Sequence, residues 1–319
     1  MKERNRTIDA ISGFFILEII IQHILQNSGL YDGSFFEKYI IRYFPAFMPW
    51  FYFKAGLMYK QPLNFKEAIK SRAIKLLYPF IVWSIIPSVL VLPFFILDRN
   101  LSEYIREIGG SLYYAHGPFN TPLWFLPSLL LAYSIIYALK KNYIYSMMVC
   151  SVVISYIFCQ IHITFPLGVN NLPLGILFFG FGIIVKDYKN THKTLLLFIF
   201  LMNMCFLWLI PSQVNFHQNK LVYGNYFLYF VEIFIFLFFL YLTTLHNISI
   251  KGLTNIGQKS ILLYVTHAPI IVITKKINDS FNLDLSSEYL AIIYTVGIIL
   301  TTILIFKYNK KVTILFKLK

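Results

Sequence analysis

The stretch YGNYFLYFVEIFIFLFFLYLTTL, residues 223–245, holds one charged residue, Glu232, and is long enough to cross the hydrocarbon core of a bilayer as a helix. Within lipid a helix pairs its backbone N–H and C=O groups inside its own segment, and the run lacks the strict alternation of a barrel strand. The whole chain has the same character. Of its 319 residues 58% are hydrophobic and 13% are charged, whereas roughly a quarter are charged in a soluble domain.

Similar apolar runs recur along the chain and predict about ten transmembrane helices. They lie at residues 8–27, 40–60, 76–97, 122–139, 143–160, 168–186, 194–211, 223–245, 258–277 and 288–306. The first run carries Glu18 and His23 and does not resemble a cleaved secretory signal. We find neither a linker nor an internal repeat. The sequence therefore predicts one domain, residues 1–319, folded as an all-α bundle that passes repeatedly through the inner (plasma) membrane of the cell.

The basic residues predict how this bundle is oriented. Most of the 28 Lys and Arg residues fall in the N-terminal segment and in segments 60–75, 140–141, 186–193, 251–259 and 307–319. Such short basic segments favour the cytoplasmic side, so we expect both termini in the cytoplasm. The net charge of +14 has the same origin, because the basic residues form no continuous stripe of the kind that binds nucleic acid. The bilayer is the expected surrounding, with no nucleic-acid partner.

Ionisable residues within the predicted spans are candidates for function, because charge is costly in lipid. His23 lies near the outer end of the first span and could take a proton from an attacking hydroxyl, or it could bridge helices. His267 lies in the ninth span and precedes Pro269, which frees a backbone carbonyl to line a cavity or to pair with a neighbouring helix. Lys54 could bind substrate or neutralise Glu18 or Glu232.

Arg72 and Lys75, three residues apart at the start of the third span, share one helix face. They could bind the phosphates of a cytoplasmic cofactor such as coenzyme A, or they could serve as ordinary positive anchors. The outer segment 98–121 is rich in aromatic and hydroxyl groups, which suits sugar binding and an interfacial aromatic belt alike. Cys150, Cys159 and Cys205 show no spacing typical of metal ligands, so no metal is expected.

Five blocks along the chain, taken together, resemble the membrane-bound acyltransferase family 3. They are RTIDAISGFFILEIIIQH (6–23), MPWFYFKAGLMYK (48–60), SRAIKLLYPFIVW (71–83), PLWFLPSLL (122–130) and IGQKSILLYVTHAPI (256–270). Asp9 and His23 match the aspartate and histidine of the family's first helix. Members of this family O-acylate lipopolysaccharide, capsule, exopolysaccharide and peptidoglycan. The resemblance implies transfer of an acetyl or similar acyl group from acyl-CoA to a hydroxyl of a cell-surface or lipid-linked glycan.

The resemblance also implies roles for individual residues. His23, His267 and Asp9 would be catalytic, with His23 as general base and His267 lining the tunnel or stabilising the oxyanion; Lys54, Arg72 and Lys75 would bind the cofactor. The sequence departs from the family at Ser12, where members carry an arginine or lysine eleven residues before the histidine. Lys54 could replace that charge, and the alternative is reduced or absent activity. A saccharide transporter or flippase and a non-catalytic membrane scaffold are the competing interpretations.

Overall fold

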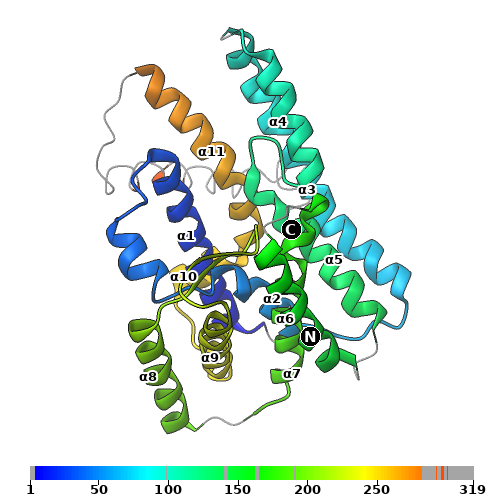
Figure 1. Cartoon of the computed structure of the whole chain (residues 1–319), viewed down its shortest axis with the longest axis vertical. Helices are drawn as coiled ribbons and strands as arrows, with labels where there is room; N and C mark the ends of the chain where they lie inside the picture. The colour runs from blue at the N-terminus through cyan, green and yellow to red at the C-terminus, as the bar shows by residue number, and fades with distance from the viewer. Residues whose placement is uncertain are drawn as a thin grey trace.

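The computed structural model describes residues 4–97, 99–139, 143–161, 165–189 and 192–281, together with residues 292, 296–297 and 300 (Figure 1). Its elements in chain order are α1 (Arg6–Ser28), the π-helical turn η1 (Phe36–Ile41), α2 (Phe47–Leu57), α3 (Phe65–Leu97), α4 (Leu101–Tyr114), the 3-10 turn η2 (Thr121–Trp124), α5 (Phe125–Ala138), α6 (Ile144–Ile161), the 3-10 turn η4 (Pro166–Asn171), α7 (Leu172–Val185), α8 (Lys193–Leu209), β1 (Gln213–Asn215), β2 (Lys220–Tyr223), α9 (Tyr226–Thr244), α10 (Lys251–Gln258) and α11 (Ser260–Phe281). Apart from the small antiparallel pair β1–β2, these described elements are helical, as predicted.

Six described helical segments are long and apolar enough to cross a membrane, namely α1, α3, η2 with α5, α6, η4 with α7, and α9. The helices α10 and α11 meet at a bend of 78° and make a seventh span if they are counted as one. The chain is thus a helical membrane protein. The total of ten spans and the cytoplasmic placement of both termini stay predictions, and the predicted span 288–306 lies almost wholly outside the described residues.

Residues 40–60, predicted as a membrane span, have a different structure. They comprise the end of η1 and the 11-residue helix α2. At 1.5 Å per residue, α2 is about half as long as a bilayer core is thick. Trp50 and Phe53 of α2 are completely buried. Gly56 of α2 lies against Gly182 of α7 so closely that a Cβ on either glycine would collide with backbone of the other helix. The apolar sequence of α2 therefore fills the protein interior rather than facing lipid.

Segment 98–121, predicted as a loop, is largely the helix α4, which returns beside the second half of α3 (Figure 1). The hydroxyl of Tyr104 donates a hydrogen bond to the Ser88 carbonyl, at 3.1 Å. Its ring also stacks on Phe119 with the ring centroids 5.6 Å apart. This hairpin brings the turn after α4 alongside the middle of α3, next to the candidate site.

The N-terminal half of α1 packs on α10, a helix far along the chain. A Cβ at Gly13 would collide with the backbone of Leu253, and a Cβ at Gly257 with the backbone of Asp9. The same end of α1 is fixed by the Asn5 amide, which donates to the Thr244 carbonyl at 2.7 Å, and its side-chain oxygen caps the helix by accepting from the N–H of Thr7 at 3.0 Å. This contact fixes the position of α1 along the axis of the bundle, and hence the position of His23.

Candidate active site

Helices α1 and α11 bring His23 and His267 into contact. The centroids of the two imidazole rings are 5.3 Å apart, and the ring planes are inclined by 32°. His267 is fully buried, whereas His23 is partly buried and lines a cavity. Two of the residues predicted from the sequence to be catalytic therefore form one pair.

The two ring nitrogens of His267 have different surroundings. Nδ1 lies 2.6 Å from the Tyr264 carbonyl oxygen and 3.2 Å from that of Leu263. Because carbonyl oxygens only accept, Nδ1 carries the hydrogen, and in the neutral ring Nε2 carries the lone pair. Nε2 is buried and has no hydrogen-bond partner among the described residues. In this form His267 accepts a proton or hydrogen bond at Nε2, and it has no free N–H to offer an oxyanion.

Asn120, in the turn between α4 and η2, holds the helix of His267 against α3. Its amide nitrogen donates to the Val265 carbonyl at 3.0 Å and to the Trp83 carbonyl at 3.2 Å. Each of these carbonyls lies four residues before a proline, Pro269 or Pro87, which has no N–H to bond it. The carbonyl freed by Pro269 is therefore paired with a neighbouring element, one of the two outcomes expected from the sequence.

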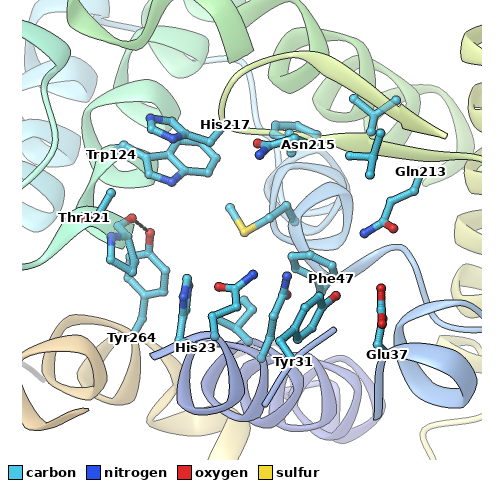
Figure 2. Close-up of a pocket in the computed structure, with 18 of the residues that line it drawn as sticks. His23, Tyr31, Glu37, Phe47, Thr121, Trp124, Gln213, Asn215, His217 and Tyr264 are labelled. Carbon is cyan, nitrogen blue, oxygen red and sulfur yellow. Dashed lines mark hydrogen bonds between the residues drawn. The ribbon is translucent and has the colours of Figure 1, made fainter. Parts of the chain in front are cut away.

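A polar cavity of about 370 Å³ opens beside His23 (Figure 2). His23 rises from α1 on one side, and Trp124 and His217 face it from the other. Tyr264 lies at one end of the cavity, and Glu37 lies at the opposite end. The wall also contains the amide side chains of Gln22, Gln26, Gln213 and Asn215, together with Tyr31, Asp32 and Thr121. The wall thus offers hydrogen-bonding amides and hydroxyls beside aromatic faces.

The wall opposite His23 is a stack of aromatic rings. His217 lies on Trp124 with ring centroids 4.9 Å apart and planes inclined by 18°. His116 meets the edge of His217 at 6.3 Å. Burial, together with the neighbouring His116, lowers the pKa of His217 to about 4, so His217 is neutral at physiological pH. This wall therefore offers a flat, uncharged surface to a ligand.

A second cavity, of about 90 Å³, adjoins the polar one and is apolar. Tyr264 and Met48 line both cavities. The remaining lining comes from Ile16, Phe51, Leu76, Phe125, Leu126, Leu129, Ser260 and Ile261. The ring centroid of Tyr264 is 5.9 Å from that of His267, so this shared wall lies next to the histidine pair.

Asp9, the third residue predicted to be catalytic, lies at the other end of α1. Its carboxylate accepts hydrogen bonds from Arg4 at 2.5 and 3.0 Å, and fourteen residues of helix, about 21 Å, separate it from His23. Asp9 does not line either cavity. The structure thus places Asp9 with Arg4, away from the histidine pair.

Lys54 reaches the position of the missing family cation. Its Nζ donates to Ser12 Oγ at 2.8 Å, and the indole nitrogen of Trp50 donates to the same oxygen at 3.1 Å. Among the described residues Lys54 forms no ion pair with Glu18 or Glu232, and the Glu18 oxygens have no hydrogen-bond partner there. The ammonium group of α2 therefore lies at Ser12, the position where the resemblance implies a cation on α1.

The two remaining predicted cofactor residues differ from each other. Arg72 is partly buried and lies over the Tyr133 ring, with 4.4 Å between the guanidinium carbon and the ring centroid. Its Nε also donates to the Tyr137 hydroxyl at 3.4 Å. Lys75 is exposed, and its ammonium group forms no hydrogen bond or ion pair with the described residues. Contacts with two tyrosines thus hold Arg72 in place one helical turn before Leu76, which lines the apolar cavity. Lys75 is a cation exposed at the surface.

The structure adds site residues that the sequence analysis did not single out, namely Asn120, Trp124, His217, Gln213 and Tyr264. Trp124 and Tyr264 lie within the blocks that resemble the family, which was the available signal. The segment after α8 gave no signal, because its role depends on the hairpin that folds it over the cavity. Among the described residues, no group of three or more His, Cys, Asp or Glu side chains could hold a metal ion.

A helical membrane protein with a histidine pair between a polar and an apolar cavity has the architecture of an integral membrane enzyme. The sequence pattern of acyltransferase family 3, described as an acyltransferase domain, matches residues 5–307, and the chain belongs to this family. The protein is accordingly an acyltransferase. No curated protein and no solved structure matches the chain.

Proposed function

We propose that the protein transfers an acetyl or similar acyl group from acyl-CoA to a hydroxyl of a cell-surface or lipid-linked glycan, in the inner (plasma) membrane. The observation that carries the proposal is that a polar and an apolar cavity share Tyr264 as a wall, beside His23 and His267. An acyl transferase needs two such approaches, one for a hydrophilic acceptor and one for the acyl chain of the donor.

The donor approaches from the end of the bundle that the basic residues predict to be cytoplasmic. Leu76, one of the residues that line the apolar cavity, lies one helical turn from Arg72 and next to Lys75. Guanidinium and ammonium groups there, with Lys54, would bind the phosphates of coenzyme A. The acyl thioester would then pass along Leu126 and Leu129 to the histidine pair.

The acceptor approaches from the other end, through the polar cavity. Sugar rings present apolar C–H faces and hydroxyl edges, which match the Trp124–His217 wall and the surrounding amide side chains. The glycan hydroxyl would lie against His23, the only histidine of the pair that lines this cavity.

His23 acts as general base in the proposed reaction. It removes the proton of the glycan hydroxyl while the oxygen attacks the thioester carbonyl, and the tetrahedral intermediate expels CoA, whose sulfur receives the proton from His23. His267 Nε2, which holds a lone pair and has no partner among the described residues, would accept the other N–H of the His23 ring and so fix its tautomer. A covalent acyl-histidine relay uses the same groups and fits the geometry equally.

Mass spectrometry of surface glycans tests the proposal. Cells with the wild-type protein should carry acyl esters that disappear when the gene is deleted. The His23→Ala variant should lower ester formation by roughly 10²–10⁴-fold, as expected when a general base is removed, while the protein stays inserted. His246→Ala, at an exposed histidine outside both cavities, is the matched control and should act as wild type. A glycan that keeps its esters without the gene contradicts the proposal.

A further inference from the structure

The polar cavity has a charge pattern that the proposed function does not use. Two carboxylates, Asp32 and Glu37, are among its lining residues, and no lysine or arginine of the described chain lines it. Glu37 is partly buried and its carboxylate accepts a hydrogen bond from the Gly33 N–H at 2.6 Å. The side chain is therefore held in place at the end of the cavity opposite Tyr264 (Figure 2).

Two cations lie near these carboxylates, but neither is among the residues that line the cavity. Lys38 Nζ lies 3.9 Å from the position that a Cβ on Gly33 would take, on the turn whose N–H bonds Glu37. Neither Asp32 nor Glu37 forms an ion pair within the described residues. Arg42, a nearby cation, does not line the cavity, and its Nη2 points to the Trp208 carbonyl oxygen at 3.5 Å. Burial and the charge of Glu37 raise the pKa of Tyr31, another lining residue, so the phenol stays protonated. His217 is neutral, as described above.

We infer that this cavity selects its acceptor by charge, favouring glycans with protonated amino sugars over neutral glycans and rejecting glycans of uronic acids. The inference rests on the proposed function and narrows its acceptor class. Asp32 and Glu37 are the specificity-determining residues. Glu37 lies at the end of the cavity opposite Tyr264, so it would bind a sugar next to the one that is acylated and leave the reacting hydroxyl to His23.

Three tetrasaccharides of equal length test the inference, namely a glucosamine tetramer, an N-acetylglucosamine tetramer and a galacturonic acid tetramer. Binding to the purified full-length protein and formation of base-labile esters from acetyl-CoA are measured for each at slightly acidic pH, where the amine is protonated. The expected order is cationic, then neutral, then anionic. Glu37→Gln and Asp32→Asn should each reduce the preference for the cationic tetramer by roughly fivefold, and added salt should reduce it further.

Gln keeps an oxygen that can accept from Gly33, so Glu37→Gln removes charge with little change of shape. Glu103→Gln, at an exposed carboxylate of α4 outside the cavity, is the control and should leave the order unchanged. Ester formation without charge preference, or with the anionic tetramer favoured, overturns the inference alone. Charge-selective binding without any ester contradicts the proposed function alone, and absence of binding by all three tetramers contradicts both.

Discussion

His267 offers the reaction only one ring nitrogen, because the other is bonded to its own helix. An asparagine can donate from its amide to the Tyr264 carbonyl as Nδ1 does, but it has no atom at the position of Nε2. His267→Asn should therefore keep thermal stability near that of the wild type and lower the transfer rate roughly 10- to 100-fold, the range found for groups that orient a reacting ligand. Initial rates and melting temperatures check this, with His246→Asn as control, and an Asn variant with the wild-type rate would remove Nε2 from the mechanism.

Substitution of Lys54 tests whether a phosphate contact that the resemblance places at position 12 of α1 is supplied here from α2. Its ammonium group lies on Ser12, so Lys54→Met should weaken acyl-CoA binding by roughly ten- to a hundredfold, as for one charge-assisted hydrogen bond. Adding Ser12→Arg should restore part of that affinity. Isothermal titration with acetyl-CoA measures both effects.

A structural role for Lys54 gives the opposite pattern. In that case Lys54→Met lowers the melting temperature, Glu18→Gln or Glu232→Gln rescues it, and Ser12→Arg brings no gain in affinity.

At the scale of single residues, the sequence identified the chemistry but not the partners. His23 and His267 were found because ionisable groups are costly in apolar runs. Their contact depends on the positions of α1 and α11 along the bundle axis. Packing between helices sets these positions, and the hydrophobic periodicity of a single helix does not predict them. Asp9 lies at the opposite end of the same helix, as its spacing from His23 requires.

The helices α3 and α11 depend on one amide for two of their backbone carbonyls. Removing it in Asn120→Ala leaves the Trp83 and Val265 carbonyls without this donor, at a cost of roughly 1–3 kcal/mol of unfolding free energy. It should also lower activity, because Val265 adjoins the turn that carries His267. Denaturation in mild detergent and initial rates measure the two effects.

The prolines provide the control for Asn120. Pro87→Ala and Pro269→Ala restore the N–H groups that would bond these carbonyls within their own helices. In that double background Asn120→Ala should cost clearly less stability than in the wild type. An equal cost in both backgrounds would show that Asn120 acts through other contacts.

At the scale of elements, hydropathy predicted the long apolar helices, including the largely buried η4 with α7, but it misjudged α2 and α4. Residues 223–245 became α9 because one uninterrupted apolar run has only one low-energy arrangement in a bilayer. Residues 40–60 are also largely apolar, but α2 is buried against α7 through Gly56 and Gly182. Apolar composition does not distinguish lipid from protein interior. The converse holds for α4, whose charged residues suggested a loop although the segment is helical.

The orientation of the whole molecule is the next test, since the donor and acceptor approaches require opposite sides. Lys66→Cys and Lys220→Cys, at exposed residues, can be labelled in intact cells after the three native cysteines are replaced. An impermeant maleimide should react with residue 220 from outside and with residue 66 only after the membrane is opened. Labelling of both from one side would overturn the orientation and the two approaches together.

The contact between α1 and α10 has a consequence for how the protein is made. Gly13 and Asn5 dock on residues 244–257, so the first helix to leave the ribosome must wait in the membrane until nearly the last has been synthesised. At the known pace of translation this wait is on the order of ten seconds or more. During it His23 lacks His267, and the two cavities lack the Tyr264 wall that separates them. A chain interrupted before α10 can insert its early helices but cannot assemble the histidine pair, so unfinished chains in the membrane should be unable to consume acyl-CoA.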